Sequence, residues 1–169
     1  SPEWLQALIV RLKNLGLNVA LDSSGAALRA GLKAAPWLIK PNTEELADVL
    51  GCEVVSVTAQ AEAASRLHAQ GIEHVVISHG ADGVNWFSVG SALHATPPKV
   101  SVASTVGAGD SLLAGMLHGL LSADTPEQTL RTATAIAAMA VTQIGFGIGD
   151  TAQLAQLEQG VRVRPLTEQ

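Results

Sequence analysis

The hydrophobic and polar positions of the chain follow two different spacings. Segments with apolar residues every three to four positions predict helices. These segments are residues 3–15, 24–32, 43–50, 58–70, 110–121, 126–143 and 150–159. Short, nearly continuous apolar runs predict buried strands. These runs are residues 17–21, 36–40, 74–78, 84–87 and 92–95. We expect the last two strands to form a hairpin around Gly90.

The order of these elements predicts a parallel α/β sheet. Short buried strands that alternate with helices are typical of βαβ units, in which helices cover both faces of one sheet. Such sheets bind their ligands beyond the carboxyl ends of the strands. The loops in which to look for chemistry are therefore residues 22–24, 41–43 and 79–81.

The composition narrows the class of protein. The chain has 169 residues, of which 47% are hydrophobic and 15% are charged, so it is long and apolar enough for a real core. Its apolar runs are too short for a membrane span. The net charge of -5 and the scattered Lys and Arg argue against a nucleic-acid partner. Cys52 is the only cysteine, which suits a reducing, cytoplasmic location.

The stretch STVGAGDS, residues 104–111, places two glycines and an aspartate at the start of a predicted helix. Glycines let a ligand approach the backbone closely, and the free N–H groups of a first helical turn attract anions. A phosphate bound there would lie beside Asp110, whose carboxylate would help if it accepted a proton from an attacking hydroxyl. The simpler explanation is a glycine-rich turn with Asp110 as a first-turn acid.

The stretch KPNTEE, residues 40–45, also allows two explanations. Asn42 and Glu45 have the spacing of a capping box that starts a helix. In the functional interpretation, Glu45 holds Mg²⁺ through water while Lys40 and Asn42 face nucleotide phosphates. One acid suffices for that role, because Mg²⁺ keeps several waters and takes few carboxylates.

The stretch SHGADG, residues 78–83, ends a predicted strand with two glycines. It is either a turn into the hairpin or a loop in which Ser78 and the Gly80 backbone contact ribose or phosphate. His79 lies in this loop and is a weaker candidate for a nucleotide contact. No histidine has zinc-ligand spacing, and the sequence contains neither of the two common phosphate-binding glycine motifs. The small side chains of residues 126–143 suit close helix packing or contact with a flat ring.

Taken in this order, KPN-x-x-E, S-x-G-x-x-G and STVGAGDS resemble the motifs of ribokinase-like carbohydrate kinases of the PfkB type. The resemblance covers residues 1–160 and is greatest to the C-terminal half of bacterial enzymes that phosphorylate fructose 1-phosphate. It implies a three-layer α/β/α ribokinase-like sheet, with residues 1–169 as a single C-terminal, ATP-binding and catalytic portion. The family's N-terminal strands, sugar-binding motif and β lid are not found in this sequence.

The resemblance also implies ATP and Mg²⁺ as cofactors and a role for each motif. Asp110 matches the catalytic base, and Glu45 matches the residue that holds Mg²⁺. Gly107, Ala108 and Gly109 match the anion hole that steadies the transferring phosphoryl group. The ATP contacts that it implies are Lys40, Asn42, Ser78, Gly80, Gly83, Thr105, Val106, Gly107, Ala108 and Gly109. The adenine is expected between residues 94–102 and the helix at residues 126–143.

The function that the resemblance implies is phosphoryl transfer from ATP to a small sugar phosphate, most simply fructose 1-phosphate to fructose 1,6-bisphosphate. A tagatose-6-phosphate kinase is one alternative, and a nucleotide-binding fragment without catalysis is another. A sheet that lacks its N-terminal strands has an open edge. We therefore expect the chain to associate with itself or with a missing N-terminal half.

Overall fold

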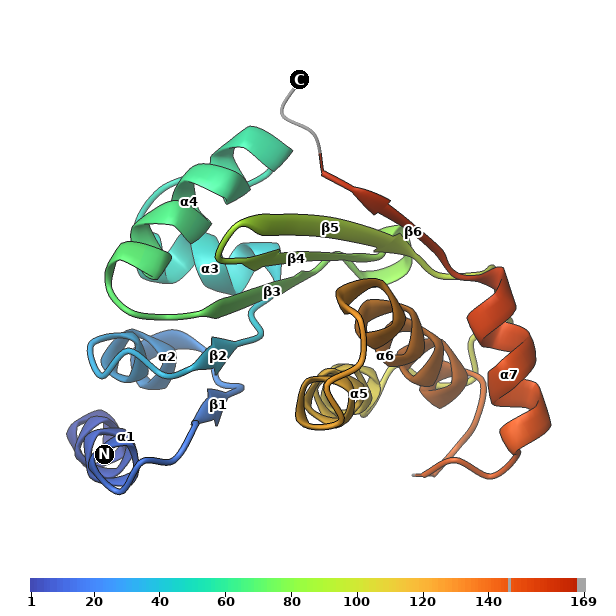
Figure 1. Ribbon diagram of the computed structural model, residues 1–169, viewed down its shortest axis with the longest axis horizontal. Helices are drawn as coiled ribbons and strands as arrows, with labels where there is room; N and C mark the ends of the chain where they lie inside the picture. The colour runs from blue at the N-terminus through green and yellow to red at the C-terminus, as the bar shows by residue number, and fades with distance from the viewer. Residues whose placement is uncertain (146, 167–169) are drawn as a thin grey trace. The chain divides into compact units, whose positions relative to one another are not determined.

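A computed structural model describes residues 1–145 and 147–166 of the chain. Helices separate the strands of its first part, with two helices in succession before the third strand (Figure 1). These elements are α1 (Pro2–Asn14), β1 (Ala20–Leu21), α2 (Gly25–Leu32), β2 (Leu38–Ile39), α3 (Thr43–Leu50), α4 (Val57–Ala69) and β3 (His74–Ser78). A short 3₁₀ turn, Gly80–Asp82, precedes the second part. That part contains β4 (Val84–Ser88), β5 (Ser91–Thr96), α5 (Ala108–Leu121), α6 (Pro126–Val141), α7 (Thr151–Gly160) and β6 (Arg162–Pro165).

The strands follow the order β1-β2-β3-β4-β5-β6 in one sheet. The strands β1, β2 and β3 are parallel, as the βαβ pattern predicts. Their register places Leu21 opposite Ile39, and Ile39 opposite Val75. The predicted α/β class is therefore confirmed.

The predicted helices and strands are all present, but two strands are shorter and one was missed. The strands β1 and β2 have two residues each, because the ladder pairs only part of each predicted run: the end of residues 17–21 and the middle of residues 36–40. The helix predicted at residues 150–159 is present, but the prediction that it is the last element is wrong. The strand β6 follows α7 and pairs antiparallel with β5, with Arg162 opposite Thr96. Its sequence, RVRP, has exposed residues at three of its four positions and lacks the pattern of a buried strand.

The chain divides into two compact units, which are described separately. Unit 1 comprises Ser1–Ser78, Trp86–Ala92 and, among the described residues after them, Leu166. Unit 2 comprises His79–Asn85 and the described residues of Leu93–Pro165. The prediction that the whole chain forms one functional portion stays a prediction.

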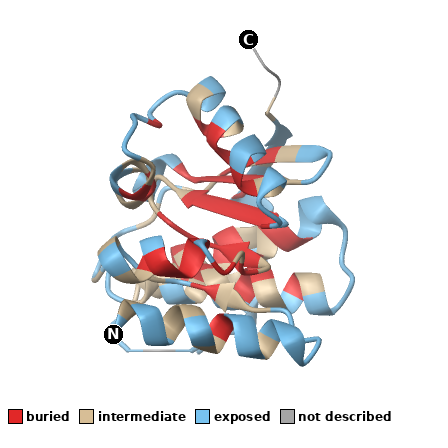
Figure 2. Cartoon of the chain, turned by 90° about the vertical axis from the view of Figure 1, so that its left-hand side faces the viewer, coloured by how far each residue is buried: buried red, intermediate tan, exposed pale blue. Residues whose placement is uncertain are grey.

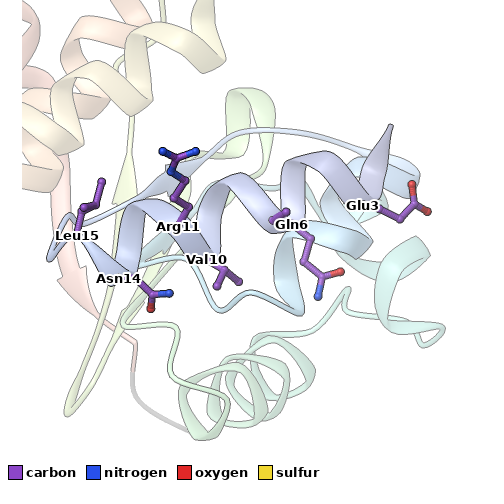
Figure 3. Close-up of a pocket in the computed structure, with 7 residues that line it drawn as sticks. Glu3, Gln6, Val10, Arg11, Asn14 and Leu15 are labelled. Carbon is purple, nitrogen blue, oxygen red and sulfur yellow. The ribbon is translucent and has the colours of Figure 1, made fainter.

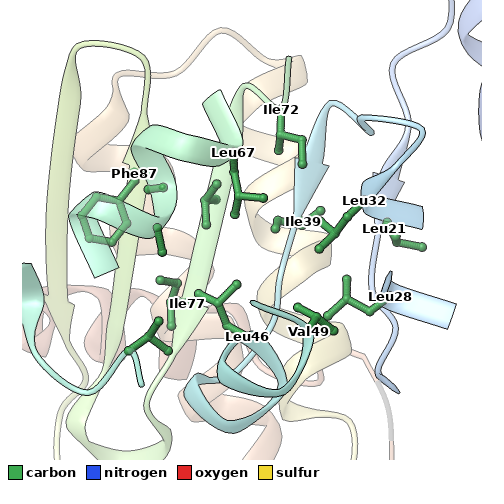
Figure 4. Packing of buried hydrophobic residues seen from close by; sticks show 14 of the residues in the cluster. Leu21, Leu28, Leu32, Ile39, Leu46, Val49, Leu67, Ile72, Ile77 and Phe87 are labelled. Carbon is green, nitrogen blue, oxygen red and sulfur yellow. The ribbon is translucent and has the colours of Figure 1, made fainter. Parts of the chain in front are cut away.

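The core of unit 1 lies between the parallel strands and the helices α2, α3 and α4. Figure 4 shows Ile39 and Ile77 of the strands packed among leucines of the three helices. Ile39, Leu46 and Ile77 are completely buried. Burial of each such side chain contributes about 1.5–3 kcal/mol, so this cluster contributes much of the stability of unit 1.

The core of unit 2 is built around the close approach of α5 and α6. A Cβ atom on Gly115 would lie 2.5 Å from Cα of Ala133, and one on Gly119 would lie 2.5 Å from Oγ1 of Thr129. Real side chains do not tolerate such distances, so the two glycines let the helix backbones touch. The small side chains of α6 therefore serve close helix packing, as the simpler of the two explanations predicted.

The helix α1 is the most exposed helix of unit 1. The hydroxyl of Ser1 caps its start by accepting from the N–H of Trp4, and Ile9 is its one buried residue. Figure 2 shows most of this helix, which begins at the label N, as exposed or intermediate. Among the described residues, no helix is both long and apolar enough to cross a membrane.

Candidate functional site

The candidate residues of unit 1 lie where the parallel strands end. Lys40 follows β2 directly and is only 6% exposed. Its ammonium group lies 3.2 Å from Oδ2 of Asp22, which follows β1. A buried cation needs such a partner, because removal of a charge from water is costly. Lys40 is a predicted phosphate contact, and its pairing with Asp22 was not predicted.

Asn42 and Glu45 form a complete capping box at the start of α3. Oδ1 of Asn42 accepts from the N–H of Glu45 at 2.8 Å, and Oε2 of Glu45 accepts from the N–H of Asn42 at 2.9 Å. The structural explanation of this motif is therefore confirmed.

The fit of Glu45 to Mg²⁺ depends on its own carboxylate. Among the described residues, no three His, Cys, Asp or Glu side chains gather to hold a metal directly. Glu45 is neither buried nor fully exposed, and the capping box occupies one of its oxygens. A single carboxylate of this kind suits an ion held through water and by the phosphates of a ligand. The assignment of Mg²⁺ to Glu45 stays a prediction.

The S-x-G-x-x-G stretch is divided between the units. In unit 1, the N–H of Ser78 donates to the carbonyl of Pro41 at 3.1 Å, and Ser78 forms a parallel bridge with Asn42. The last residue of β3 is thus held beside the first residues after β2. Two of the predicted nucleotide contacts, Ser78 and Asn42, are neighbours in the fold.

In unit 2, residues 79–83 form a tight turn. The N–H of His79 donates to the carbonyl of Gly83 at 2.8 Å. Gly83 has a φ of 111°, and a Cβ there would lie 2.0 Å from the carbonyl oxygen of Ala95. The glycine is therefore required by packing, whatever else it does. Gly80 is exposed at the first position of the 3₁₀ turn.

Two histidines lie near this turn. Nδ1 of His94 is 2.6 Å from Oδ1 of Asn85, and its Nε2 is 3.0 Å from Oγ1 of Thr96. Burial is the main cause that lowers the pKa of His94, and the positive charge of Arg164 adds to it. Burial also lowers the pKa of His79, whose Nε2 is buried with no hydrogen-bond partner in the structure. Sequence spacing gave no signal for the His94 network.

The start of α5 carries the remaining candidates. The helix begins at Ala108, after Gly107, which has a left-handed backbone with a φ of 82°. No side chain caps this start, in contrast to α3. Asp110 lies in the first turn and is exposed, while Gly107, Ala108 and Gly109 are partly exposed. Thr105 and Val106 precede the turn and are exposed. The N–H of Ala108 makes a long bond, 3.4 Å, to the carbonyl of Thr105. The lack of a side-chain cap and the helix dipole favour an anion here.

A cavity of about 540 Å³ adjoins this start within unit 2. Gly107 and Asp110 line it, together with residues of α5, α6 and the segment that begins α7. Its further lining residues are Ser111, Ala114, Gly115, His118, Thr132, Ile136, Met139, Ala140, Gly147, Ile148 and Leu154. None of residues 94–102 lines this cavity, so it is not the adenine position that we predicted. That position stays a prediction.

Comparison with known proteins identifies the family. A family model described as "pfkB family carbohydrate kinase" matches residues 1–152. The chain belongs to this family. A 1-phosphofructokinase of Vibrio cholerae is 48% identical over 166 residues, which is 98% of this chain and 52% of that relative. The chain thus spans about half the length of the curated relatives that it matches. The family assignment from the three motifs is therefore confirmed.

Solved structures of the family confirm the fold. Phosphofructokinase-2 of Escherichia coli, in complex with substrates and products, matches with a TM-score of 0.86 and 28% identity. The match covers 94% of this chain and 52% of that one. A ribokinase of Arabidopsis thaliana, solved with ribose and ATP, matches with a TM-score of 0.80 and 23% identity over 94% of this chain and 53% of that one. The predicted ribokinase-like α/β fold is therefore confirmed.

Proposed function

We propose that this chain is the portion of a kinase that binds ATP and contains the catalytic base. The kinase phosphorylates fructose 1-phosphate to fructose 1,6-bisphosphate. The relative from V. cholerae, named 1-phosphofructokinase, supports the substrate. The observation that carries the proposal is the start of α5, where an exposed carboxylate adjoins a helix N-terminus that no side chain caps. This arrangement suits a phosphoryl group and the hydroxyl that attacks it.

The role of each residue in unit 2 follows from its position. Asp110 accepts the proton of the attacking hydroxyl, because it lies at the helix start to which the phosphoryl group would bind. The N–H groups of Gly107, Ala108 and Gly109 donate to the phosphoryl oxygens as charge develops there. Gly107 has a left-handed backbone, which glycine adopts without strain. Thr105, Val106, Gly80 and Gly83 contribute backbone contacts to the nucleotide.

The residues of unit 1 act on the phosphates of the nucleotide. Lys40 donates a hydrogen bond to a phosphate oxygen while Asp22 keeps its ammonium group in place, so the contact does not depend on an unpaired positive charge. Asn42 and Ser78 are joined by their backbones and present polar side chains from neighbouring strand ends. Glu45 would hold Mg²⁺ through water. When bound, this ion neutralises negative charge on the phosphates.

The test is ADP release by this polypeptide with Mg-ATP and fructose 1-phosphate. We expect Asp110→Asn to lower the turnover by about a thousandfold, because the variant cannot accept the proton. The matched control is Asp124→Asn, the same change at another exposed acid of unit 2. It should leave the turnover within about twofold, since surface changes away from a site have small effects.

The other outcomes decide between the alternatives. Equal turnover by Asp110→Asn and the unchanged chain would contradict the role of Asp110. Nucleotide binding without any sugar-dependent turnover would favour a nucleotide-binding portion that needs further residues for catalysis. Faster turnover with tagatose 6-phosphate than with fructose 1-phosphate would replace the proposed substrate.

A further inference from the structure

The helix α1 has one face in the core of unit 1 and the opposite face outward. Ile9 is 1% exposed and belongs to the hydrophobic cluster, and Leu5 packs against that cluster. On the outer side, Val10 is 42% and Leu15 is 69% exposed, and both line one surface groove. Exposed apolar side chains that line a groove mark a candidate interaction surface.

A groove of about 450 Å³ runs along this outer face, and we call it the α1 groove. It is lined by Glu3, Gln6, Ala7, Val10, Arg11, Asn14 and Leu15. Four of these residues, Glu3, Ala7, Arg11 and Leu15, are spaced by four and form one ridge. The other three, Gln6, Val10 and Asn14, form the neighbouring ridge. Figure 3 shows Arg11 and Leu15 along one side of the helix, and Val10 and Asn14 along the other.

The shape of the α1 groove is that of a site for another helix. Helices commonly pack by inserting a ridge of residues spaced by four into the groove between two such ridges of the partner. Ala7 is the smallest residue of the lining and lies at the middle of its ridge. A partner helix would approach most closely there.

The charges of the α1 groove show which helix fits. Glu3 lies four residues before Ala7, and Arg11 lies four residues after it. If two copies of α1 meet at Ala7 in antiparallel directions, Glu3 of each copy faces Arg11 of the other. Such a contact is isologous and pairs opposite charges twice. Arg11 is the cation among the residues that line the groove, while the positive charges of Lys33 and of the chain's own amino group also act on Glu3.

We propose that the α1 groove binds α1 of a second copy of this chain, antiparallel, with Ala7 at the two-fold axis and Glu3–Arg11 pairs on both sides. The helix has 13 residues and is therefore about 20 Å long. A contact along a single helix of this length is short for a specific interface. The dimer is therefore weak and depends on concentration. This inference goes beyond the proposed function, which assigns no role to α1.

Charge reversal tests the proposal. The dissociation constant of the dimer is measured by sedimentation velocity for the unchanged polypeptide, Glu3→Arg, Arg11→Glu and the double variant. We expect each single reversal to raise the dissociation constant by about tenfold, because two like-charged pairs then meet. The double variant restores both pairs and should return the constant to within about threefold. Added salt should weaken the unchanged dimer, since the pairs are exposed.

A matched control and a second variant keep the test decisive. Glu62→Arg makes the same change on α4, where Glu62 and Arg66 are an exposed pair 4.0 Å apart, and should leave the dimer unchanged. Ala7→Arg fills the groove without altering the first turn of α1, and should abolish the dimer. This variant gives an independent test in case Glu3→Arg unfolds the helix. Circular dichroism checks that each variant is folded.

Two outcomes would overturn the proposal. The first is a polypeptide that stays monomeric at every concentration reached. The second is a dimer that tolerates both single reversals and Ala7→Arg. That result would assign the contact to another surface, such as the open edge of β1.

Discussion

The starts of α3 and α5 differ in how their first N–H groups are treated: side chains cap α3, and none caps α5 among the described residues. Every helix begins with N–H groups that lack partners inside the helix. At α3, the side chains of Asn42 and Glu45 satisfy two of them with a complete capping box. At α5, Gly107 offers no side chain, and the start stays uncapped. A start that its own side chains close is built for stability, whereas an uncapped one is available to an anion.

The charges of the two units repeat this difference. The buried Lys40 of unit 1 is neutralised by Asp22 within the protein. The carboxylate of Asp110 in unit 2 is exposed to solvent. The polar groups at the strand ends of unit 1 therefore have partners within the protein. Within the described part of the chain, the carboxylate of Asp110 and the start of α5 lack side-chain partners of this kind.

The largest expected effect comes from removal of the partner of Lys40. Asp22→Asn leaves a buried ammonium group without its counter-charge, and should lower the free energy of unfolding by about 2–3 kcal/mol. Urea denaturation measures this loss. The control is Asp48→Asn, which removes the exposed partner of Arg29 at 3.4 Å and should change stability by less than about 0.5 kcal/mol. Equal effects of the two changes would contradict the claim that unit 1 depends on its buried pair.

A smaller loss is expected when the capping box is removed. Asn42→Ala deletes the acceptor for the N–H of Glu45 and should cost about 1 kcal/mol of stability. The matched change at α5, Ala108→Ser, alters a residue of the uncapped start and should cost less than about 0.5 kcal/mol. Thermal unfolding in the absence of nucleotide measures both. If Asn42→Ala left the thermal stability unchanged, the capping box would not stabilise α3 more than the uncapped start stabilises α5.

The uncapped start of α5 should bind a simple anion. Inorganic phosphate, followed by calorimetry, is expected to bind this start, and Asp110→Asn should tighten the binding by about two- to fivefold. The cause is the removal of a negative charge from the first turn. The same substitution lowers the turnover in the proposed function, so the two effects have opposite signs. Weaker phosphate binding by Asp110→Asn would contradict an anion site at α5.

The stability of unit 1 should fall at acid pH because of a buried histidine, His74. Burial, chiefly, lowers the pKa of His74, the positive charge of His68 adds to this, and Glu73 opposes it. The folded state therefore prefers the neutral ring, and the stability that it contributes is present above the unfolded pKa of about 6.5 and declines as the pH falls below it. His74→Gln should make the free energy of unfolding less dependent on pH between about 7 and 5. If the free energy of unfolding from urea titrations depended on pH to the same extent in His74→Gln, His74 would not be a source of that pH dependence.

The sequence predicted the features that local signals determine. The capping box of Asn42 and Glu45, the glycine turn before α5 and the helix limits depend on residues near one another in the chain. The pair of Lys40 and Asp22 could not be predicted in that way. The two residues meet only because β1 and β2 are parallel neighbours in a register that aligns Leu21 with Ile39.

The strand β6 was missed for a related reason. Its residues carry no periodic apolar pattern, because three of the four are exposed. Its existence depends on the free edge of β5, with which it pairs over four residues. Periodic apolar patterns in a sequence arise from buried positions. An edge strand with mostly exposed residues has few buried positions and therefore shows no such pattern.

The capping box has a consequence for how such motifs diverge in evolution. Asn42 and Glu45 begin α3, so selection for folding alone would retain them in a descendant that had lost its chemistry. Asp110 is exposed in the first turn of α5, and its replacement would disturb the fold little. If Asp110 is the catalytic base, a descendant that had lost its activity could replace it with little cost to the fold, whereas loss of the capping box would cost stability. The proposed catalytic residue is therefore the one that contributes least to the fold.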